Sequence, residues 1–271
     1  MSEQRVTIDV TDHIADVRMV RGDKHNGLDG HMFVALRDAA RKIKTIAGVR
    51  AVVLSGDGPS FSAGLDIQSF FNPDSPVDMN GLIDRPEGEI ANLAQAVAVD
   101  WRDVPVPVIA AIHGNCFGGG LQIALGADIR IATADAKLSV MEIKWGLVPD
   151  MGLTVTLPQV VSQDVAKELT FTGRIVSGSE ADALGLVTRT AEDPRAAALE
   201  LARAIADRSP DAIRAGKKLL NEAWFLDDDA AALKLETELQ LPLLGSPNQM
   251  AAATAAFTKQ PGEFVDPEPT A

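Results

Sequence analysis

The stretch PVPVIAAIHGNCFGGGLQIALGADIRIAT, residues 105–133, carries the clearest structural pattern in the chain. Its apolar run at 106–114 predicts a strand that is buried on both faces, as in a parallel sheet. A glycine-rich turn follows, then a short helix near 119–126 and a second strand at 128–133. This order of strand, helix and strand predicts an α/β fold in which the loops at the strand ends are available for chemistry.

The residues before and after this stretch extend the pattern. The upstream part predicts a hairpin of strands at 5–10 and 14–20, a helix from about Asp29 to Ile46 and a buried strand at 50–56. The proline-containing segment 72–88 is expected to be a mobile loop beside the site. Downstream, Ser209 and Pro210 start a predicted helix, and further helices are expected near 229–243 and 247–258.

Composition and charge limit the classes of protein and ligand. The chain has 271 residues, of which 46% are hydrophobic and 23% charged, a balance typical of a soluble globular protein. The single cysteine, Cys116, excludes an intrachain disulfide, and the N-terminal residues do not resemble a secretion signal, so we expect a cytoplasmic protein. The net charge of −13, without a basic stripe, argues against nucleic acid or an anionic membrane as partner.

Two strand-to-helix turns share a glycine-rich character. The first is SFSAGLDI at 60–67, and the second is GGGLQ at 118–122. Glycine lets the backbone approach a ligand closely, and a helix start leaves N–H groups without helical acceptors. Two such turns side by side would aim two N–H donors at one point, an oxyanion hole suited to a thioester carbonyl that becomes an enolate. From spacing alone, the alternative is that these glycines serve tight packing.

Two acids lie close together in MEIKWGLVPD, residues 141–150. Gly146 and Pro149 predict a bent loop that presents the carboxyls of Glu142 and Asp150. Two carboxyls in an apolar pocket can divide the work, one as base and one as acid. Partial burial is expected from the apolar neighbours Val140, Met141, Trp145, Leu147 and Val148. The alternative is a pair of solvated surface acids.

Other familiar catalytic patterns are absent from the sequence. It contains no GxSxG, HExxH or CxxC motif, and the four histidines lack the spacing of metal ligands. The glycine-rich run at 114–120 lacks the ending of a phosphate-binding P-loop. We therefore expect no metal and no redox cofactor.

Taken together and in this order, five motifs resemble the crotonase superfamily, the enoyl-CoA hydratase/isomerase family. They are KHNGL at 24–28, SGDGPSFSAGLDI at 55–67, the stretch 105–133, MEIKWGLVPDMGLT at 141–154 and TGRIVSGSEADALGLV at 172–187. The resemblance implies an α/β spiral of ββα units over 1–208 that holds an acyl-CoA site. It also implies a helical region over 209–260 for oligomerisation and part of the CoA site, and we expect 261–271 to be a disordered tail. The expected assembly is a homotrimer or a dimer of trimers.

The resemblance also implies roles for particular residues. The oxyanion donors would be the N–H groups of Leu65 and Gly119. The path of the coenzyme A moiety of the substrate would be lined by Lys24, Asn26, Ala63, Gly64, Asp66 and Ile67. Lys259 would contact a phosphate of coenzyme A.

The acids depart from the family pattern. Typical hydratases carry a glutamate where this chain has Gln122, which can hydrogen-bond to substrate or water but cannot transfer a proton at neutral pH. The pair Glu142 and Asp150 is similar to the dienoyl-CoA isomerase branch, although that branch has an aspartate at the position of Gln122. We therefore favour an enoyl- or dienoyl-CoA double-bond isomerase. The alternatives are a 2-enoyl-CoA hydratase of fatty-acid β-oxidation, with Asp150 or Gln122 placing water, and an acyl-CoA-binding protein without turnover.

Overall fold

The computed structural model describes residues 4–72 and 74–268. Its main sheet has six strands in the order β1-β2-β3-β4-β6-β9. Their bounds are Val6–Thr11, Ile14–Met19, Ala51–Gly56, Val108–Ile112, Ile129–Ala132 and Arg189–Thr190. The hairpin β1–β2 is antiparallel and every other pairing is parallel, which confirms the predicted hairpin and the two buried parallel strands β3 and β4.

The structure also contains a smaller sheet of three strands. Its strands are β5 (Asn115–Phe117), β7 (Lys137–Ser139) and β8 (Val176–Ser177), in that order. Gly114 links β4 to β5 with a φ of +57°, and a Cβ there would lie 2.0 Å from the carbonyl oxygen of Pro59. Only glycine fits this crossing, because the positive φ and the close approach both exclude a side chain.

Eleven helices surround the sheets in the described residues. They are α1 (Gly30–Thr45), α2 (Met79–Ile83), α3 (Leu93–Val99), α4 (Gly119–Leu125), α5 (Leu153–Thr156), α6 (Gln163–Thr172), α7 (Gly178–Ala183), α8 (Pro194–Ala206), α9 (Pro210–Ala223), α10 (Asp229–Gln240) and α11 (Pro247–Thr258). Short 3₁₀ helices are η1 (Gly22–Lys24), η2 (Ile67–Phe71), η3 (Glu142–Trp145) and η4 (Leu157–Gln159). Within the described ranges, no helix has the length and apolar character that a membrane crossing requires.

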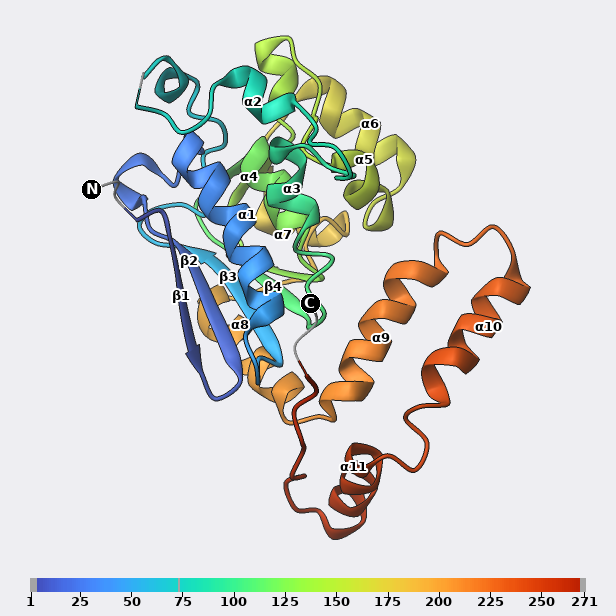
Figure 1. Ribbon diagram of the computed structural model, residues 1–271. Coiled ribbons are helices and arrows are strands. Elements are labelled where there is room, and N and C mark those ends of the chain that lie inside the picture. The colour runs from blue at the N-terminus through green and yellow to red at the C-terminus, as the bar shows by residue number, and fades with distance from the viewer. Residues whose placement is uncertain (1–3, 73, 269–271) are drawn as a thin grey trace.

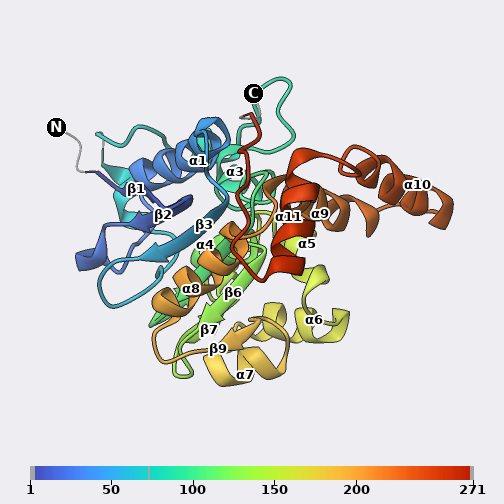
Figure 2. The same ribbon diagram turned by 90° about the horizontal axis from the view of Figure 1, so that it is seen from below.

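Alternate side chains of the central strands pack on opposite faces of the main sheet. Val52 and Leu54 belong to the larger core, which includes residues of α1, α3 and α4 (Figure 1). Ala51 and Val53 belong to a second core with Ala198 and other residues of α8, which covers the other face (Figure 2). The sheet is therefore buried on both sides, as its continuous apolar runs predict.

Helix α1 agrees closely with its sequence prediction. It spans Gly30–Thr45, and the expected start at Asp29 is its N-cap, whose Oδ1 accepts a hydrogen bond from the Met32 amide at 2.8 Å. Such a cap satisfies one of the N–H groups that the first helical turn leaves unpaired. Segment 72–88, expected to be a loop, contains the short helix α2, which the carboxyl of Asp78 caps and which buries Leu82. Residue 73 of that segment lies outside the described residues.

The C-terminal helices extend away from the sheets. Figure 1 shows α9, α10 and α11 beside the core, joined to it through α9. The buried Nζ of Lys217 donates to the carbonyls of Trp101 and Val106 and to the carboxyl of Asp128, which is 2.7 Å away. These three acceptors compensate for burying a charged group and hold α9 in place.

The segment that follows α11 is ordered by contacts with the core. The Arg50 guanidinium donates to the carboxyl of Asp266 and to the carbonyl of Phe264. The Asn248 side chain exchanges two hydrogen bonds with the backbone of Val265. The expectation of a disordered tail is therefore wrong for 261–268, because a buried arginine and an asparagine bind its backbone and its acid; the last three residues lie outside the description.

Candidate active site

The segments that lead into the two glycine-rich turns are hydrogen-bonded to each other through their backbones. The amide of Phe61 donates to the carbonyl of His113, and that of Ser62 donates to Asn115. In return, the Phe117 amide donates to the carbonyl of Ser62 at 3.0 Å. The chain around 61–62 thus runs parallel to β5, so the two turns leave this pairing next to each other.

Gly64 brings the turns into contact. Its φ is +85°, and a Cβ at this position would lie 2.6 Å from the Phe117 carbonyl oxygen and 3.6 Å from the nitrogen of Gly119. Across the described residues, the amides of Leu65 and Gly119 have no hydrogen-bond acceptor. The structure therefore brings together the two predicted donors on adjacent turns and leaves both N–H groups available to a ligand.

Glu142 lies against the second of these turns. It is the first residue of η3, and its Oε1 would be 3.3 Å from a Cβ on Gly118, the residue before the predicted donor Gly119. Burial raises the pKa of the Glu142 carboxyl, against the effect of nearby backbone amides and Gln122, and the charge of Asp150 adds to the rise. A carboxyl with a raised pKa beside a turn that carries an unoccupied amide has the properties of an acid–base group.

Gln122 uses both ends of its side chain within the protein. Its Nε2 donates to Oε1 of Glu142 at 2.7 Å, and its Oε1 accepts from the amide of Met151 at 2.9 Å. The residue is 1% exposed. Both polar ends of Gln122 are therefore engaged by Glu142 and by Met151, and its expected contact with substrate stays a prediction.

Asp150 has a different setting from Glu142. It is exposed, and its charge still contributes to the pKa of Glu142, so the two carboxyls share one region. The expected partial burial of the acids is confirmed for Glu142 but wrong for Asp150, and the neighbouring Trp145 and Val148 are 66% and 74% exposed. Gly146 ends η3 in a left-handed conformation, and the residues on both sides of it, 143–148, are exposed.

Most residues predicted along the coenzyme A path line one cleft of about 660 Å³. Its lining includes Lys24, Ala63, Gly64, Leu65 and Asp66, together with Arg21, His25 and Gln68, which the sequence analysis did not single out. Ile67 starts η2 and does not line the cleft. The sequence gives no direct signal for Arg21, because its role depends on an ion pair at 2.8 Å with Asp66, which is distant in sequence.

Two predicted coenzyme A contacts lie elsewhere. Asn26 is fully buried, and its side chain accepts from the Arg21 amide and donates to the carbonyls of Asp57 and Ser60. Asn26 therefore fixes the shape of the turn and does not face the cleft. Lys259 follows α11 in a left-handed conformation and is not part of the cleft lining, so its phosphate contact stays a prediction.

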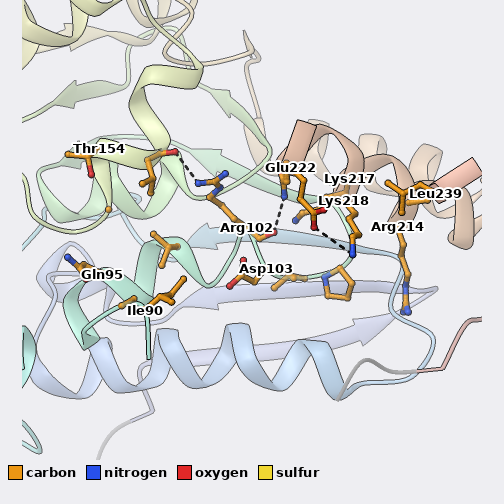
Figure 3. Close-up of a pocket in the computed structure, with 18 of the residues that line it drawn as sticks. Ile90, Gln95, Arg102, Asp103, Thr154, Arg214, Lys217, Lys218, Glu222 and Leu239 are labelled. Carbon is orange, nitrogen blue, oxygen red and sulfur yellow. Dashed lines mark hydrogen bonds and ion pairs between the residues drawn. The ribbon is translucent and has the colours of Figure 1, made fainter. Parts of the chain in front are cut away.

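A second hollow of about 810 Å³ lies between α3, α5 and α9. Figure 3 shows Gln95 and Ile90 at one end of this groove and Lys217, Lys218 and Glu222 of α9 toward the other. Gly152 and Thr154 also line it, so it begins two residues beyond Asp150. No local motif predicts such a groove, because its walls come from three separate parts of the chain.

Comparison with known proteins agrees with this architecture. The family model described as Enoyl-CoA hydratase/isomerase matches residues 9–258. The chain is 34% identical over 225 residues to a mouse mitochondrial Delta(3,5)-Delta(2,4)-dienoyl-CoA isomerase, covering 76% of this chain and 64% of that protein. It is 30% identical over 246 residues to a rat mitochondrial methylglutaconyl-CoA hydratase, covering 88% and 75%. The chain thus spans slightly less than two thirds of the mouse protein.

A solved structure supports the same assignment. The enoyl-CoA hydratase of Bacillus anthracis superposes with a TM-score of 0.86 at 26% identity, covering 96% of this chain and 99% of that one. The fold is therefore that of the crotonase superfamily, as the sequence motifs predict. The chain belongs to the enoyl-CoA hydratase/isomerase family and is an acyl-CoA enzyme of that class.

Proposed function

We propose that the protein is an enoyl- or dienoyl-CoA isomerase that moves a double bond through a thioester enolate. The observation that carries this proposal is the arrangement around Gly118 and Gly119. Two neighbouring turns carry amides without acceptors in the described structure, Glu142 with its raised pKa lies against one of these turns, and Asp150 lies close enough to affect that pKa. The second acid is thus on the loop after Glu142, while position 122 carries an amide.

The proposed reaction has two proton transfers. The thioester oxygen accepts hydrogen bonds from the amides of Leu65 and Gly119 while one of the two acids removes a proton from carbon. The electron pair of that C–H bond forms a new carbon–carbon double bond, and the carbonyl electrons move to oxygen. The other acid then protonates a carbon further along the conjugated chain, the carbonyl reforms and the double bond has moved. The two amides stabilise the charge that develops on oxygen.

This chemistry needs no metal and no redox cofactor. Substrate and product have the same atoms and the same oxidation level, and the charge of the enolate is placed on backbone donors. Coenzyme A enters as part of the substrate, for which we propose the cleft beside Lys24 and Arg21. In a chain of net charge −13, these cations offer local attraction for its phosphates.

The second candidate is a 2-enoyl-CoA hydratase. It is favoured by the Gln122–Glu142 hydrogen bond, which leaves Glu142 as a single buried acid that can activate water, with Asp150 or Gln122 helping to place it. The rat relative is named as a hydratase. In this reaction Glu142 would take a proton from water as oxygen adds to the third carbon of the acyl chain, and the enolate would be protonated at the second carbon.

Two substrates separate the proposals. The protein is incubated with crotonyl-CoA and with a 3,5-dienoyl-CoA, and products are followed by absorbance and mass, since hydration adds the mass of water and isomerisation adds none. Dienoyl-CoA conversion that is lost in Asp150→Asn and kept in Asp135→Asn, an exposed acid outside the cleft, supports isomerisation. Efficient hydration unaffected by Asp150→Asn would favour the hydratase, and tight binding with no product from either thioester would indicate a binding protein.

We also propose assembly as a homotrimer or a dimer of trimers. The support is the apolar surface of the C-terminal helices, where Trp224, Leu233, Leu241 and Phe257 are exposed, Phe257 by 89%. Several large apolar side chains exposed on neighbouring elements are typical of protein–protein interfaces. Sedimentation equilibrium of the whole chain tests the assembly, and a monomer at micromolar concentration would contradict it. A cytoplasmic location likewise stays a prediction from the sequence.

A further inference from the structure

Between the two acids lies a buried amide that the proposed reaction does not use. Gln122 is the fourth residue of α4, in which every residue is buried, so the origin of its side chain is fixed by the core. We infer that Gln122 is a positioning residue, which holds Glu142 with one selected oxygen available for proton transfer and joins it to the loop that carries Asp150. This inference rests on the proposed use of Glu142 as an acid–base group.

The first part of the inference comes from the two oxygens of Glu142. Oε1 accepts the 2.7 Å hydrogen bond from Gln122 and lies against Gly118. Oε2 is buried and has no hydrogen-bond partner among the described residues. A buried carboxylate oxygen without a partner is unfavourable unless a ligand supplies one. The arrangement therefore reserves Oε2 for a proton from the substrate or from an attacking water.

The second part comes from the other end of the amide. Oε1 of Gln122 accepts from the Met151 amide at 2.9 Å, and Met151 directly follows Asp150 in the chain. Most of the loop before it is exposed, so this hydrogen bond is a fixed point where the loop rejoins the core. One side chain thus sets both the orientation of Glu142 and the place from which Asp150 extends.

An amide is suited to this position because it donates and accepts at the same time in every protonation state. An ionised glutamate at 122 would offer no donor and would place a second negative charge 2.7 Å from Oε1, where the amide nitrogen now lies. Two such carboxylates would share a proton and titrate together. With Gln122 at this position, the charge of Asp150 raises the pKa of Glu142, while the hydrogen bond from Gln122 lowers it.

Two substitutions test whether Gln122 acts through its two hydrogen bonds or only through the packing of its side chain. Gln122→Met keeps the length and most of the volume of the side chain and removes both bonds. Gln122→Glu in its protonated form keeps both, because a carboxylic acid supplies an O–H donor and a carbonyl acceptor. Gln159→Met is a matched control, since the amide of Gln159 bonds only its own helical segment, at the Val155 carbonyl.

The direct readout is the pKa of Glu142 in the whole chain. It is measured by carbon-13 NMR of protein labelled at the glutamate carboxyls, with Glu142→Gln assigning the resonance. The pKa of Glu142 is expected to rise in Gln122→Met and to stay unchanged in Gln159→Met, whereas in Gln122→Glu the carboxyls of residues 122 and 142 are expected to titrate as a pair in two separate steps. An unchanged pKa in both position-122 variants would overturn the inference, and a soluble Gln122→Glu alone suffices if Gln122→Met does not fold.

Kinetics give the second readout. Gln122→Met is expected to lower kcat about 10- to 100-fold, as loss of a hydrogen-bonding partner of a site residue commonly does, with KM changed less than about twofold. In the Glu142→Gln background the same substitution should have a smaller effect, because the part of its action that passes through Glu142 is already lost. Fully additive losses would overturn the inference. A shifted pKa in a protein that converts neither thioester would support the positioning role and contradict the proposed function.

Discussion

The two glycine turns and the loop that carries the acids meet in one site, but they differ in how deeply their residues are buried. The turns are buried at Ser62, Gly64, Gly119 and Gly120 and are interlocked, since a Cβ on Gly120 would lie 2.7 Å from that of Ser62. The acid loop is half-exposed at Glu142 and exposed at Asp150. Charge on a developing oxyanion is stabilised best by donors that do not move, whereas proton transfer depends on pKa values that exposure adjusts.

This difference extends to the two acids themselves. Glu142 is held by Gln122 and has a raised pKa because it is partly buried, whereas Asp150 lies in solvent. Acids in different environments can take different roles within one reaction. The comparison indicates that substitutions in the turns alter stabilisation of the enolate, while substitutions in the loop alter proton transfer and its dependence on pH.

Glu142→Gln is expected to have the largest effect. It removes the carboxyl that lies against the second donor turn but keeps the size of the side chain, so kcat should fall about 10²- to 10⁴-fold with either thioester. Steady-state assays with crotonyl-CoA and a 3,5-dienoyl-CoA check this result, with Glu168→Gln on the exposed side of α6 as the control. Retention of more than a tenth of the activity would show that Glu142 is not the acid–base group.

Gly64→Ala tests the interlocked turns. The added Cβ would lie 2.6 Å from the Phe117 carbonyl, so the second turn must shift and the two amides lose their alignment. We expect kcat to fall roughly 10²- to 10³-fold, as for loss of one oxyanion donor. Gly88→Ala is the matched control, because Gly88 has a similar φ of +81° with no atom within 4 Å of the added Cβ. Equal losses in both variants would assign the effect to backbone strain.

Asp150→Asn tests the influence of one acid on the other. Removing a negative charge near Glu142 lowers the pKa of that carboxyl. A rate that needs ionised Glu142 falls as pH drops through this pKa, so the variant should lose activity at a lower pH than the parent protein. The fall in rate at acid pH can be measured by the exchange of substrate hydrogens with deuterated water, which does not require complete isomerisation. If the pH at which activity falls is the same in the variant and in the parent protein, the two carboxyls act independently.

Lys24→Ala is expected to have the smallest effect. Lys24 is exposed at the edge of the cleft, where water and salt screen its attraction for an anionic ligand. We expect KM for an acyl-CoA to rise up to about fivefold with kcat unchanged, the size of a surface ion pair. Lys42→Ala on the exposed face of α1 serves as control, and the difference should shrink at high salt. An unchanged KM would place the coenzyme A path elsewhere.

The sequence predicted the elements that depend on local pattern. The strands at 14–20 and 50–56 and the helix from Asp29 follow from apolar periodicity and a capping residue, and all three are present. The two donor turns followed from glycine next to buried strands. By contrast, the expected partial burial of Asp150 was wrong, because apolar neighbours such as Trp145 and Val148 do not say which side of a loop faces the core.

The roles of single polar residues were harder to predict. Asn26 and Gln122 were both expected near substrate, yet both are buried and bonded to other parts of the protein. Their partners, Ser60 and Glu142, are distant in sequence, so no local spacing reveals these bonds. The order of 261–268 also depends on a distant residue, Arg50.

The sequence by itself determined the α/β class, the family and the two glycine turns that present backbone donors, because these follow from periodicity and from conformations that glycine favours. Only the tertiary structure decided that the turns adjoin, that Gln122 binds Glu142 and that Asp150 stays in solvent. Hydrogen bonds and burial between distant segments depend on how the chain returns to the same point in space, and that return is a property of the whole fold.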